Sequence, residues 1–344
     1  MKISLLNLNN WFMYGGKHTY MRQLYSSLVD NGVDVDMFSY ANPKGSKRIK
    51  KLELNQNYFD RYDLIHIIGF WKTETFRFMR EVEKKKINIP FDKIVITIHD
   101  PNDYNKDIIE FLSSFKEALF IFIRSSVLRH VKSNSLKRKV FIKHPYKRVC
   151  NEDLRGVRVV STARVTYRKK IEIILEAKCG IEVWTGRVDR RYNWLKLFKY
   201  YKNGIFDYPL YMGEWDDATE VYPGCCALVD LTVMKDDGGG SQYTFLEAID
   251  FGLDLILHKG WSISNDDDFK AGVYIENANE LKKQVRRSKV RFLKGEGINE
   301  SYERILSGHN HLKIGKEYLE TFQEFLNNKR SFIDRKNLVF QLRA

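Results

Sequence analysis

The sequence contains little cysteine and little proline, and it has no long hydrophobic run. The four cysteines have neither the spacing of a disulfide framework nor that of a zinc site, and the adjacent pair Cys225 and Cys226 is expected to be buried in a strand. Charged residues interrupt every apolar run well before the length that crosses a bilayer. Residues 1–8 lack the layout of a signal peptide and predict a first strand. These absences favour a cytoplasmic protein without a transmembrane segment, in a cell or as a viral protein in its host. They leave peripheral membrane contact open.

Composition indicates a folded protein of more than one domain. A chain of 344 residues suits two domains of ordinary size better than one core. A hydrophobic content of 43% with 14% aromatic residues is typical of a globular protein and excludes a disordered one.

The chain has few acidic residues relative to its basic ones, and its formal net charge is +14. This excess favours anionic partners, namely nucleotide phosphates, nucleic acid or an acidic lipid surface. The basic clusters lie at residues 44–51, 84–86, 129–139, 168–170 and 286–294. Such runs are also common on solvated faces, so the charge alone does not choose among these partners.

Short apolar runs alternate with helical patterns along the whole chain. In the first half, strands are predicted at residues 2–8, 33–38, 64–68, 94–98, 118–123 and 140–142, with a helix over 17–31 and a basic, exposed excursion over 43–57. Residues 151–156 resemble a linker, after which the pattern resumes. In the second half, strands are predicted at 157–162, 181–185, 208–212, 227–232 and 253–258, with helices over 169–178, 192–201 and 310–326. This rhythm predicts two Rossmann-like, doubly wound α/β domains facing a central cleft. Ligands then bind beyond the carboxyl ends of the strands.

One glycine-rich loop stands out, because it follows the predicted strand 227–232. Its residues Asp237, Gly238, Gly239, Gly240, Ser241 and Gln242 precede a helix that begins near Tyr243 and stops at Gly252. Glycines let a backbone approach a ligand closely, and a helix N-terminus favours an anion such as phosphate. Glu247, inside that helix, is placed to accept hydrogen bonds from a sugar or a ribose. The alternative is an ordinary connection between strand and helix with a solvated glutamate.

Three other loops carry polar residues at strand ends. Gly15 and Gly16 close the first loop and open the first helix, a second potential phosphate or acceptor site, although turns also use paired glycines. His99 ends the strand 94–98, where a histidine is more often structural than chemical. Arg164 and Lys169 flank the loop after the strand 157–162, where two cations suit a diphosphate. The alternative there is a solvated basic turn, and the sequence does not decide whether Lys169 or its neighbour Lys170 faces inward.

Taken together, these loops resemble the GT-B glycosyltransferases, in particular the large retaining group known as family 4. The resemblance covers nearly the whole chain and depends on the order and spacing of several short motifs. These are Gly15-Gly16, Asp63 to Ile67, Thr97 to Asp100, His144 to Tyr146, Ser161 to Arg164 with Lys169, Trp184 to Gly186, and Gly238 to Gly252.

The resemblance implies a retaining transfer of sugar from a UDP- or GDP-linked donor to an acceptor hydroxyl, with no cofactor and no metal. It implies an acceptor domain over 1–150 and a donor domain over 157–326, with the tail 327–344 packing on the first. Arg164 and Lys169 would bind the diphosphate, Glu247 the ribose, and His99 would lie near the transferred sugar. The substrate would also meet Gly15, Gly16 and the loop 237–243. Glycan, lipid, protein and modified DNA bases are all candidate acceptors.

One departure from the family concerns the donor sugar. The family commonly has a second glutamate eight positions before Glu247, and Gly239 stands there instead, with Asp237 as a candidate substitute. Divergent members such as the bacteriophage DNA glucosyltransferases also lack the full pair, and this chain is similar to them in its Arg-to-Lys spacing. Because this carboxylate is missing, a second interpretation stays open, namely a non-catalytic nucleic-acid-binding protein on a degenerate GT-B fold.

Two further interpretations are disfavoured. A dinucleotide-dependent oxidoreductase would have G-x-G-x-x-G after the first strand, where this chain has only paired glycines. A metal-binding glycosyltransferase of the other fold class would use acidic residues such as Asp266 to Asp268. Their place after a polar run favours a helix start or a surface loop instead.

Overall fold

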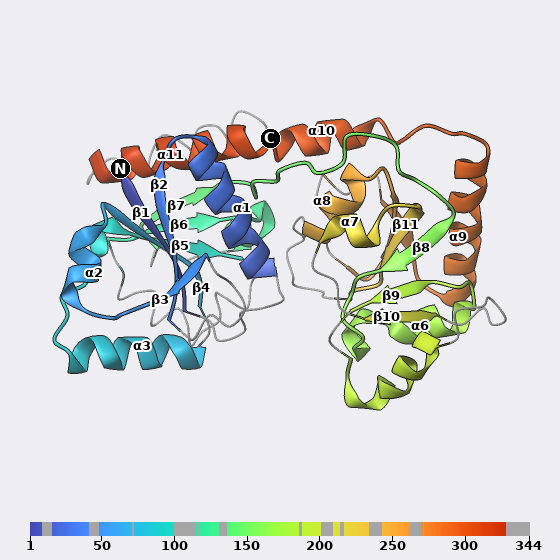
Figure 1. Ribbon diagram of the computed structural model, residues 1–344, viewed down its shortest axis with the longest axis horizontal. Helices are drawn as coiled ribbons and strands as arrows, with labels where there is room; N and C mark the ends of the chain where they lie inside the picture. Colours follow the sequence, from blue (N-terminus) through green and yellow to red (C-terminus); the bar gives the residue numbers. More distant parts are fainter. Residues whose placement is uncertain are drawn as a thin grey trace. The chain divides into compact units, whose positions relative to one another are not determined.

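The structure is a computed structural model that divides the chain into two compact units (Figure 1). The first unit comprises Met1–Lys147 with the segment from His309, and the second comprises Arg148–Gly308. The structure describes residues 1–8, 16–40, 48–70, 72–99, 115, 117–130, 136–185, 188–200, 209–213, 217–233, 243–261, 268, 270 and 272–327. Within these ranges, no helix is long and apolar enough to cross a membrane.

The first unit is built on a parallel sheet with strand order β3-β2-β1-β4-β5-β6-β7. Its strands are β1 (Lys2–Asn7), β2 (Asp34–Ser39), β3 (Ile49–Lys51), β4 (Leu64–Gly69), β5 (Ile94–Ile98), β6 (Leu119–Phe122) and β7 (Arg138–Phe141). Its helices are α1 (Gly16–Asp30), α2 (Gln56–Arg61), α3 (Lys72–Lys84), α5 (Ser125–His130) and α11 (His311–Asn327), with a 3-10 turn over Phe91–Lys93. The strand order turns back at β1, which makes the sheet doubly wound, as predicted.

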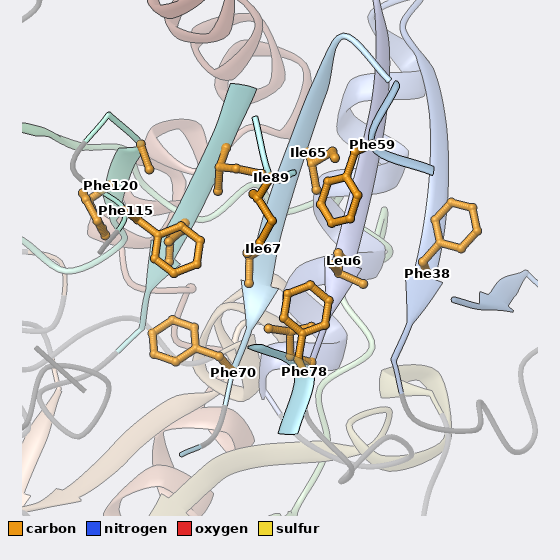
Figure 2. Packing of buried hydrophobic residues seen from close by; sticks show 14 of the residues in the cluster. Leu6, Phe38, Phe59, Ile65, Ile67, Phe70, Phe78, Ile89, Phe115 and Phe120 are labelled. Atoms are coloured by element: carbon orange, nitrogen blue, oxygen red, sulfur yellow. The ribbon is translucent and has the colours of Figure 1, made fainter. Parts of the chain in front are cut away.

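Alternate strand residues supply one core of this unit. Leu6, Ile65 and Ile67 point to the same face of the sheet because side chains alternate along a strand. They pack there with Phe59 of α2 and Phe78 of α3, as Figure 2 shows. All six residues of β4 are buried. A strand that is apolar on both faces needs helices on both sides, which explains the layered arrangement.

The opposite face of the same sheet is covered by α1 and α11. The two helices approach closely at Gly315, where an added Cβ would lie 2.3 Å from Ser27 Oγ. Beneath them, Tyr20 Oη and Tyr318 Oη share a hydrogen bond of 2.6 Å, and Tyr20 Oη also lies 3.3 Å from Thr97 Oγ1. The final helix therefore belongs to the first unit.

This placement differs from the predicted second domain of residues 157–326. The helix predicted over 310–326 is present as α11, but an amphipathic pattern does not say which sheet the apolar face will cover. In α11, Leu312 is 45% exposed, whereas Ile314, Tyr318 and Phe322 are buried. Nearly all of the tail 327–344 lies outside the described residues.

The second unit contains a parallel sheet with strand order β10-β9-β8-β11-β12-β13. Its strands are β8 (Arg158–Ser161), β9 (Glu182–Trp184), β10 (Leu210–Gly213), β11 (Cys225–Asp230), β12 (Asp254–His258) and β13 (Val273–Ile275). Its helices are α6 (Ile171–Ala177), α7 (Ala218–Val221), α8 (Tyr243–Asp250), α9 (Ala278–Leu293) and α10 (Ser301–Gly308), with 3-10 helices over Tyr167–Lys169 and Arg190–Tyr200. Cys225 and Cys226 are buried in β11, as expected, and the sheet is again doubly wound.

One prediction about local structure was wrong. The excursion 43–57 was expected to be polar and exposed, but β3 pairs with β2 there and Leu52 and Leu54 are buried. These two leucines stand among charged residues and pack into the core of the first unit. The helix predicted over 192–201 is present as a 3-10 helix over Arg190–Tyr200.

The start of β8 is held against the turn before β11 by a close approach of two backbones. Gly156 N donates to Cys225 O at 3.1 Å, and Arg158 N donates to Gly224 O at 3.0 Å. A Cβ at Gly156 would lie 2.4 Å from Gly224 O, much closer than any real contact.

We therefore expect Gly156→Ala to destabilise the second unit by roughly 1–3 kcal/mol, because backbone must move to admit one methyl group. Gly297→Ala is the matched control, since nothing lies within 4 Å of its Cβ position. Urea unfolding followed by circular dichroism measures both. Equal stability of the two variants would contradict the close approach.

Candidate functional site

The candidate site lies in the second unit, where β8 and β11 end. Lys169 is central to it: its ammonium group donates to Thr232 Oγ1 and lies 3.5 Å from Asp230 Oδ1. The same ammonium lies 5.8 Å from the centroid of the Trp261 ring. Lys169 therefore faces inward, which the sequence alone did not decide. Its neighbour Lys170 has a left-handed backbone (φ 45°) and extends over the ring of exposed Tyr167.

Asp230 organises the exit of β11. Its Oδ1 accepts hydrogen bonds from the backbone N–H of Thr232 at 3.0 Å and from the Thr232 hydroxyl. Val233 N then donates to Arg168 O at 3.0 Å, which ties this exit to the 3-10 turn over Tyr167–Lys169. Asp230 is buried, and a buried carboxylate needs a cation beside it. The carboxylate therefore holds the Lys169 ammonium, and the bond from Val233 N holds the turn that carries Lys169.

Glu247 lies inside α8 and has an unsatisfied oxygen. The residue keeps some exposed surface, but its Oε2 is enclosed and has no hydrogen-bond partner among the described residues. Burial raises the pKa of Glu247 to about 7, and the negative charges of Asp217 and Asp250 contribute to the rise. An enclosed acidic oxygen without a partner is costly unless something donates to it. Glu247 Oε2 thus has the capacity to accept a hydrogen bond that no described residue uses.

Tyr222 connects Glu247 to the end of β8. Its buried hydroxyl is hydrogen-bonded to Thr162, the residue that follows β8, and it lies 3.4 Å from Thr244 O of α8. Burial raises the pKa of Tyr222 well above its usual value, and the nearby Glu247 charge raises it further. Arg164 follows Thr162 by two residues and is exposed. The segments that carry Arg164, Lys169 and Glu247 therefore meet at one edge of the second sheet.

The far end of α8 is anchored by Asp250. Its carboxylate is fully buried and accepts from Arg148 Nε at 2.9 Å, from Val149 N at 2.8 Å and from Cys150 N at 3.1 Å. These bonds fix the helix that carries Glu247 to the segment entering the second unit. A helix fixed in this way restricts the positions that the Glu247 carboxyl can take.

The other predicted residues fall into two groups. Gly15 and the glycine loop, from Asp237 through Gly238, Gly239, Gly240 and Ser241 to Gln242, lie outside the described residues. Gly16 begins α1, as predicted, and Tyr243 begins α8 with its side chain buried. The helix ends before Gly252, whose φ of +72° is the left-handed conformation that suits a glycine there.

His99 belongs to the first unit and is described separately from the residues above. Its Nε2 lies 2.6 Å from Ile68 O and donates to that carbonyl, which places the proton on Nε2. The Tyr20 ring packs against it in a T-shaped arrangement with centroids 5.0 Å apart. Both contacts hold the imidazole in one orientation at the carboxyl end of β5.

Sequence reasoning missed several residues of this site. Asp230, Thr232 and Tyr222 were not singled out, although Asp230 and Thr232 are the polar residues at the end of a buried strand. That position was itself a usable signal, because ligand sites in open α/β sheets lie beyond carboxyl ends. Tyr222 carried no such signal. In the described part of the chain, no group of three or more His, Cys, Asp or Glu side chains is arranged to hold a metal ion.

Solved structures similar to this chain share its two-unit architecture. HepE of Anabaena, in complex with UDP-glucose, is 12% identical with a TM-score of 0.68, and the match covers 94% of this chain and 100% of HepE. Sucrose-phosphate synthase of Thermosynechococcus elongatus is 15% identical with a TM-score of 0.67, and the match covers 95% of this chain and 100% of the synthase. This chain has the GT-B fold.

A third GT-B structure is an alpha-glucosyltransferase in complex with UDP-glucose and DNA containing an abasic site. It is 11% identical with a TM-score of 0.67, and the match covers 94% of this chain and 99% of the glucosyltransferase. By sequence, no protein-family profile and no curated protein matches this chain. The predicted fold class of two Rossmann-like domains is thus confirmed, and at these identities the likeness concerns the GT-B fold alone.

Proposed function

We propose that this protein is a retaining glycosyltransferase that moves a sugar from a nucleotide-diphosphate sugar to an acceptor hydroxyl. The observation that carries the proposal is the shared edge in the second unit, where the Lys169 ammonium and the unsatisfied Glu247 oxygen lie on segments joined through Tyr222. A cation for phosphates and an acceptor for sugar hydroxyls are the two groups that a donor of this class requires. Ligands of open α/β sheets bind beyond the carboxyl ends of strands, and both residues lie on segments that follow such strands, which supports the proposal.

The cations act on the leaving group. Breaking the anomeric C–O bond leaves negative charge on the diphosphate and oxocarbenium character on the sugar. Lys169 and Arg164 stabilise that negative charge, with the glycine loop as a further proposed contact, and a preorganised donor such as Lys169 lowers the barrier by about 3 kcal/mol. Asp230 and Thr232 hold Lys169 in the free protein, so its ammonium is oriented before the donor arrives.

Glu247 binds the ribose of the donor in this proposal. A carboxylate accepts hydrogen bonds from two neighbouring hydroxyls, and Oε2 has no partner among the described residues to give up. His99 contacts the transferred sugar in this proposal. The hydrogen bond from its Nε2 to Ile68 O orients the imidazole ring. Front-face displacement follows, with the leaving phosphate accepting the acceptor's proton. No metal and no cofactor takes part in these steps.

DNA is the acceptor class with a specific observation behind it. The similar alpha-glucosyltransferase was solved with UDP-glucose and DNA, and this chain carries a net charge of +14. A modified base flipped out of the duplex would present its hydroxyl to the donor. The competing function is a nucleic-acid-binding protein without turnover, favoured by Gly239 where the family has a glutamate.

Turnover decides between these two functions. We expect the purified protein to release nucleotide from UDP-glucose or another UDP- or GDP-sugar, and more rapidly with hydroxymethylated DNA present. Released nucleotide is measured by a coupled assay and the transferred sugar by mass spectrometry. Steeply salt-dependent DNA binding with no affinity for any nucleotide sugar would instead establish the non-catalytic function.

Two adjacent lysines form a matched test of the diphosphate site. We expect Lys169→Met to weaken UDP-glucose binding by about tenfold or more, because a charge-assisted contact to phosphate is worth about 1.5–3 kcal/mol. Lys170→Met removes the same charge from a side chain that extends over Tyr167, and its affinity should change little. Isothermal titration calorimetry measures both. Equal losses would show that only general charge matters.

Removing Lys169 also leaves the buried Asp230 carboxylate without its cation, which would lower stability. A second variant therefore separates the effect on folding from the effect on binding. The double variant Lys169→Met with Asp230→Asn leaves no unpaired buried charge and should regain thermal stability. It should stay weak in donor binding, because the ammonium is still missing. Recovery of affinity in the double variant would contradict a direct contact between Lys169 and the donor.

The affinity for UDP-glucose should rise with pH through about 7. Glu247 has a raised pKa of about 7, so it is mostly protonated below that pH and ionised above it. Ribose hydroxyls donate best to the ionised form, so affinity should increase by about tenfold per pH unit below 7 and level off above it. UDP-glucose suits the titration because its diphosphate stays ionised throughout.

The control for that profile is Glu247→Gln. The amide keeps the shape of the side chain but does not ionise, so its weaker affinity should not vary with pH in this range. Binding is measured by calorimetry at each pH. A profile for Glu247→Gln that still rises through pH 7 would assign the titration to another group.

A further inference from the structure

Helix α9 presents an unusual outer face in the second unit. Its inner face packs into the core through Leu281, Val285 and Ser288, all buried against the sheet and α6. Its outer face is basic: the exposed cations are Lys282, Lys283, Arg286, Arg287 and Lys294, and Lys289 is partly exposed beside them. Figure 1 shows α9 as a single continuous helix.

These six cations lie on one stripe. At 3.6 residues per turn they fall within an arc of about 160° around the helix axis. No acidic residue lies inside this arc. The acids at its margins are already paired, Glu280 with Lys259 at 3.3 Å and Glu296 with Arg291 at 2.9 Å. Lys282, Arg286, Arg287 and Lys294 make no ion pair with any residue the structure describes.

Two apolar side chains lie in the middle of the same stripe. Leu293 is 71% exposed, the largest exposed fraction among the large hydrophobic residues of the described chain, and Val290 is 39% exposed. By helical geometry Leu293 falls between Lys282 and Arg286, and Val290 falls between Arg286 and Lys283. Lys294 and Arg287 then complete the far edge of the stripe. Apolar residues flanked on both sides by cations are the pattern of helices that lie at a membrane interface.

We infer that this outer face of α9 docks on an anionic lipid surface, with Leu293 and Val290 entering the headgroup boundary and the flanking cations meeting lipid phosphates. This inference does not depend on the proposed sugar transfer. The cations supply long-range attraction, and each is worth about fivefold in affinity near an acidic surface. Burial of the two exposed apolar side chains in the lipid boundary adds a short-range hydrophobic contribution to the affinity. A partner that is only charged would not provide this contribution.

The apolar centre is also the reason to favour lipid over nucleic acid. Phosphate backbones are bound by lysine, arginine and polar side chains, and their grooves and sugars gain little from an exposed leucine. Lipid headgroups offer both charge and an apolar layer beneath it. Leu293 therefore distinguishes the two partners, whereas the cations attract both.

The experiment is co-sedimentation of the full chain with vesicles of phosphatidylcholine alone or mixed with phosphatidylglycerol, at physiological ionic strength and without a sugar donor. We expect binding only to the anionic vesicles. The double variant Arg286→Gln with Arg287→Gln should bind about 25-fold more weakly. Leu293→Asn should bind at least about threefold more weakly, because its side chain no longer enters the interface.

Matched controls carry the same chemistry at other sites. Lys313→Gln with Lys316→Gln removes two exposed cations from α11, and Leu197→Asn removes another exposed leucine, 64% exposed. Both should bind like the unchanged protein. Circular dichroism and thermal unfolding of every variant show that folding is intact, as expected for exposed side chains.

A parallel titration with duplex DNA separates the two macromolecular partners. The inference is overturned if the unchanged protein fails to bind anionic vesicles, or if Leu293→Asn binds them as tightly as the unchanged protein does. It is also overturned if the arginine variant loses affinity for duplex DNA alone and keeps its affinity for vesicles. That last outcome would make α9 a nucleic-acid surface.

Discussion

The pairing of Lys169 with Asp230 is the interaction on which the candidate site depends. A lysine at the end of a parallel sheet would normally extend into solvent, and a carboxylate buried there would be costly to ionise. Together they satisfy each other, with the Thr232 hydroxyl beside them. The pair also sets the course of the chain, because the residue after Thr232 is hydrogen-bonded back to the turn that carries Lys169. The Lys169 ammonium and the backbone after Thr232 are therefore both held at this strand end.

Glu247 shows the opposite situation on the same edge. Its enclosed oxygen has no partner in the described protein, and two further carboxylates lie close enough to raise its pKa. An enclosed polar oxygen without a partner is costly, so it persists only where the surrounding structure holds it there. Here the anchored end of α8 holds the helix, because Asp250 accepts hydrogen bonds from two backbone N–H groups and from the Arg148 side chain. That anchor holds the end of the helix that carries Glu247 in place.

The first unit places its polar groups differently. Tyr20, Thr97, His66 and Tyr318 form a buried network between the sheet and the helices α1 and α11. Burial lowers the pKa of His66 to about 3, so it stays neutral at physiological pH. These residues fix the C-terminal helix on the first sheet, and they do so with hydrogen bonds that specify one arrangement. His99 lies beside this network and takes its orientation from Tyr20 and from Ile68 O.

The sequence by itself determined the rhythm of strands and helices, the two doubly wound sheets and the strand ends at which a site should be sought. It did so because burial on both faces of a parallel strand leaves an apolar run that can be read locally, as in residues 94–98. It also pointed to Lys169 and Glu247 by their place after such runs. Only the tertiary structure decided which of two adjacent lysines faces inward, because Asp230 is 61 residues away from Lys169. The raised pKa of Glu247 and the docking of α11 on the first sheet likewise arise from contacts between residues distant in the chain, which no local pattern records.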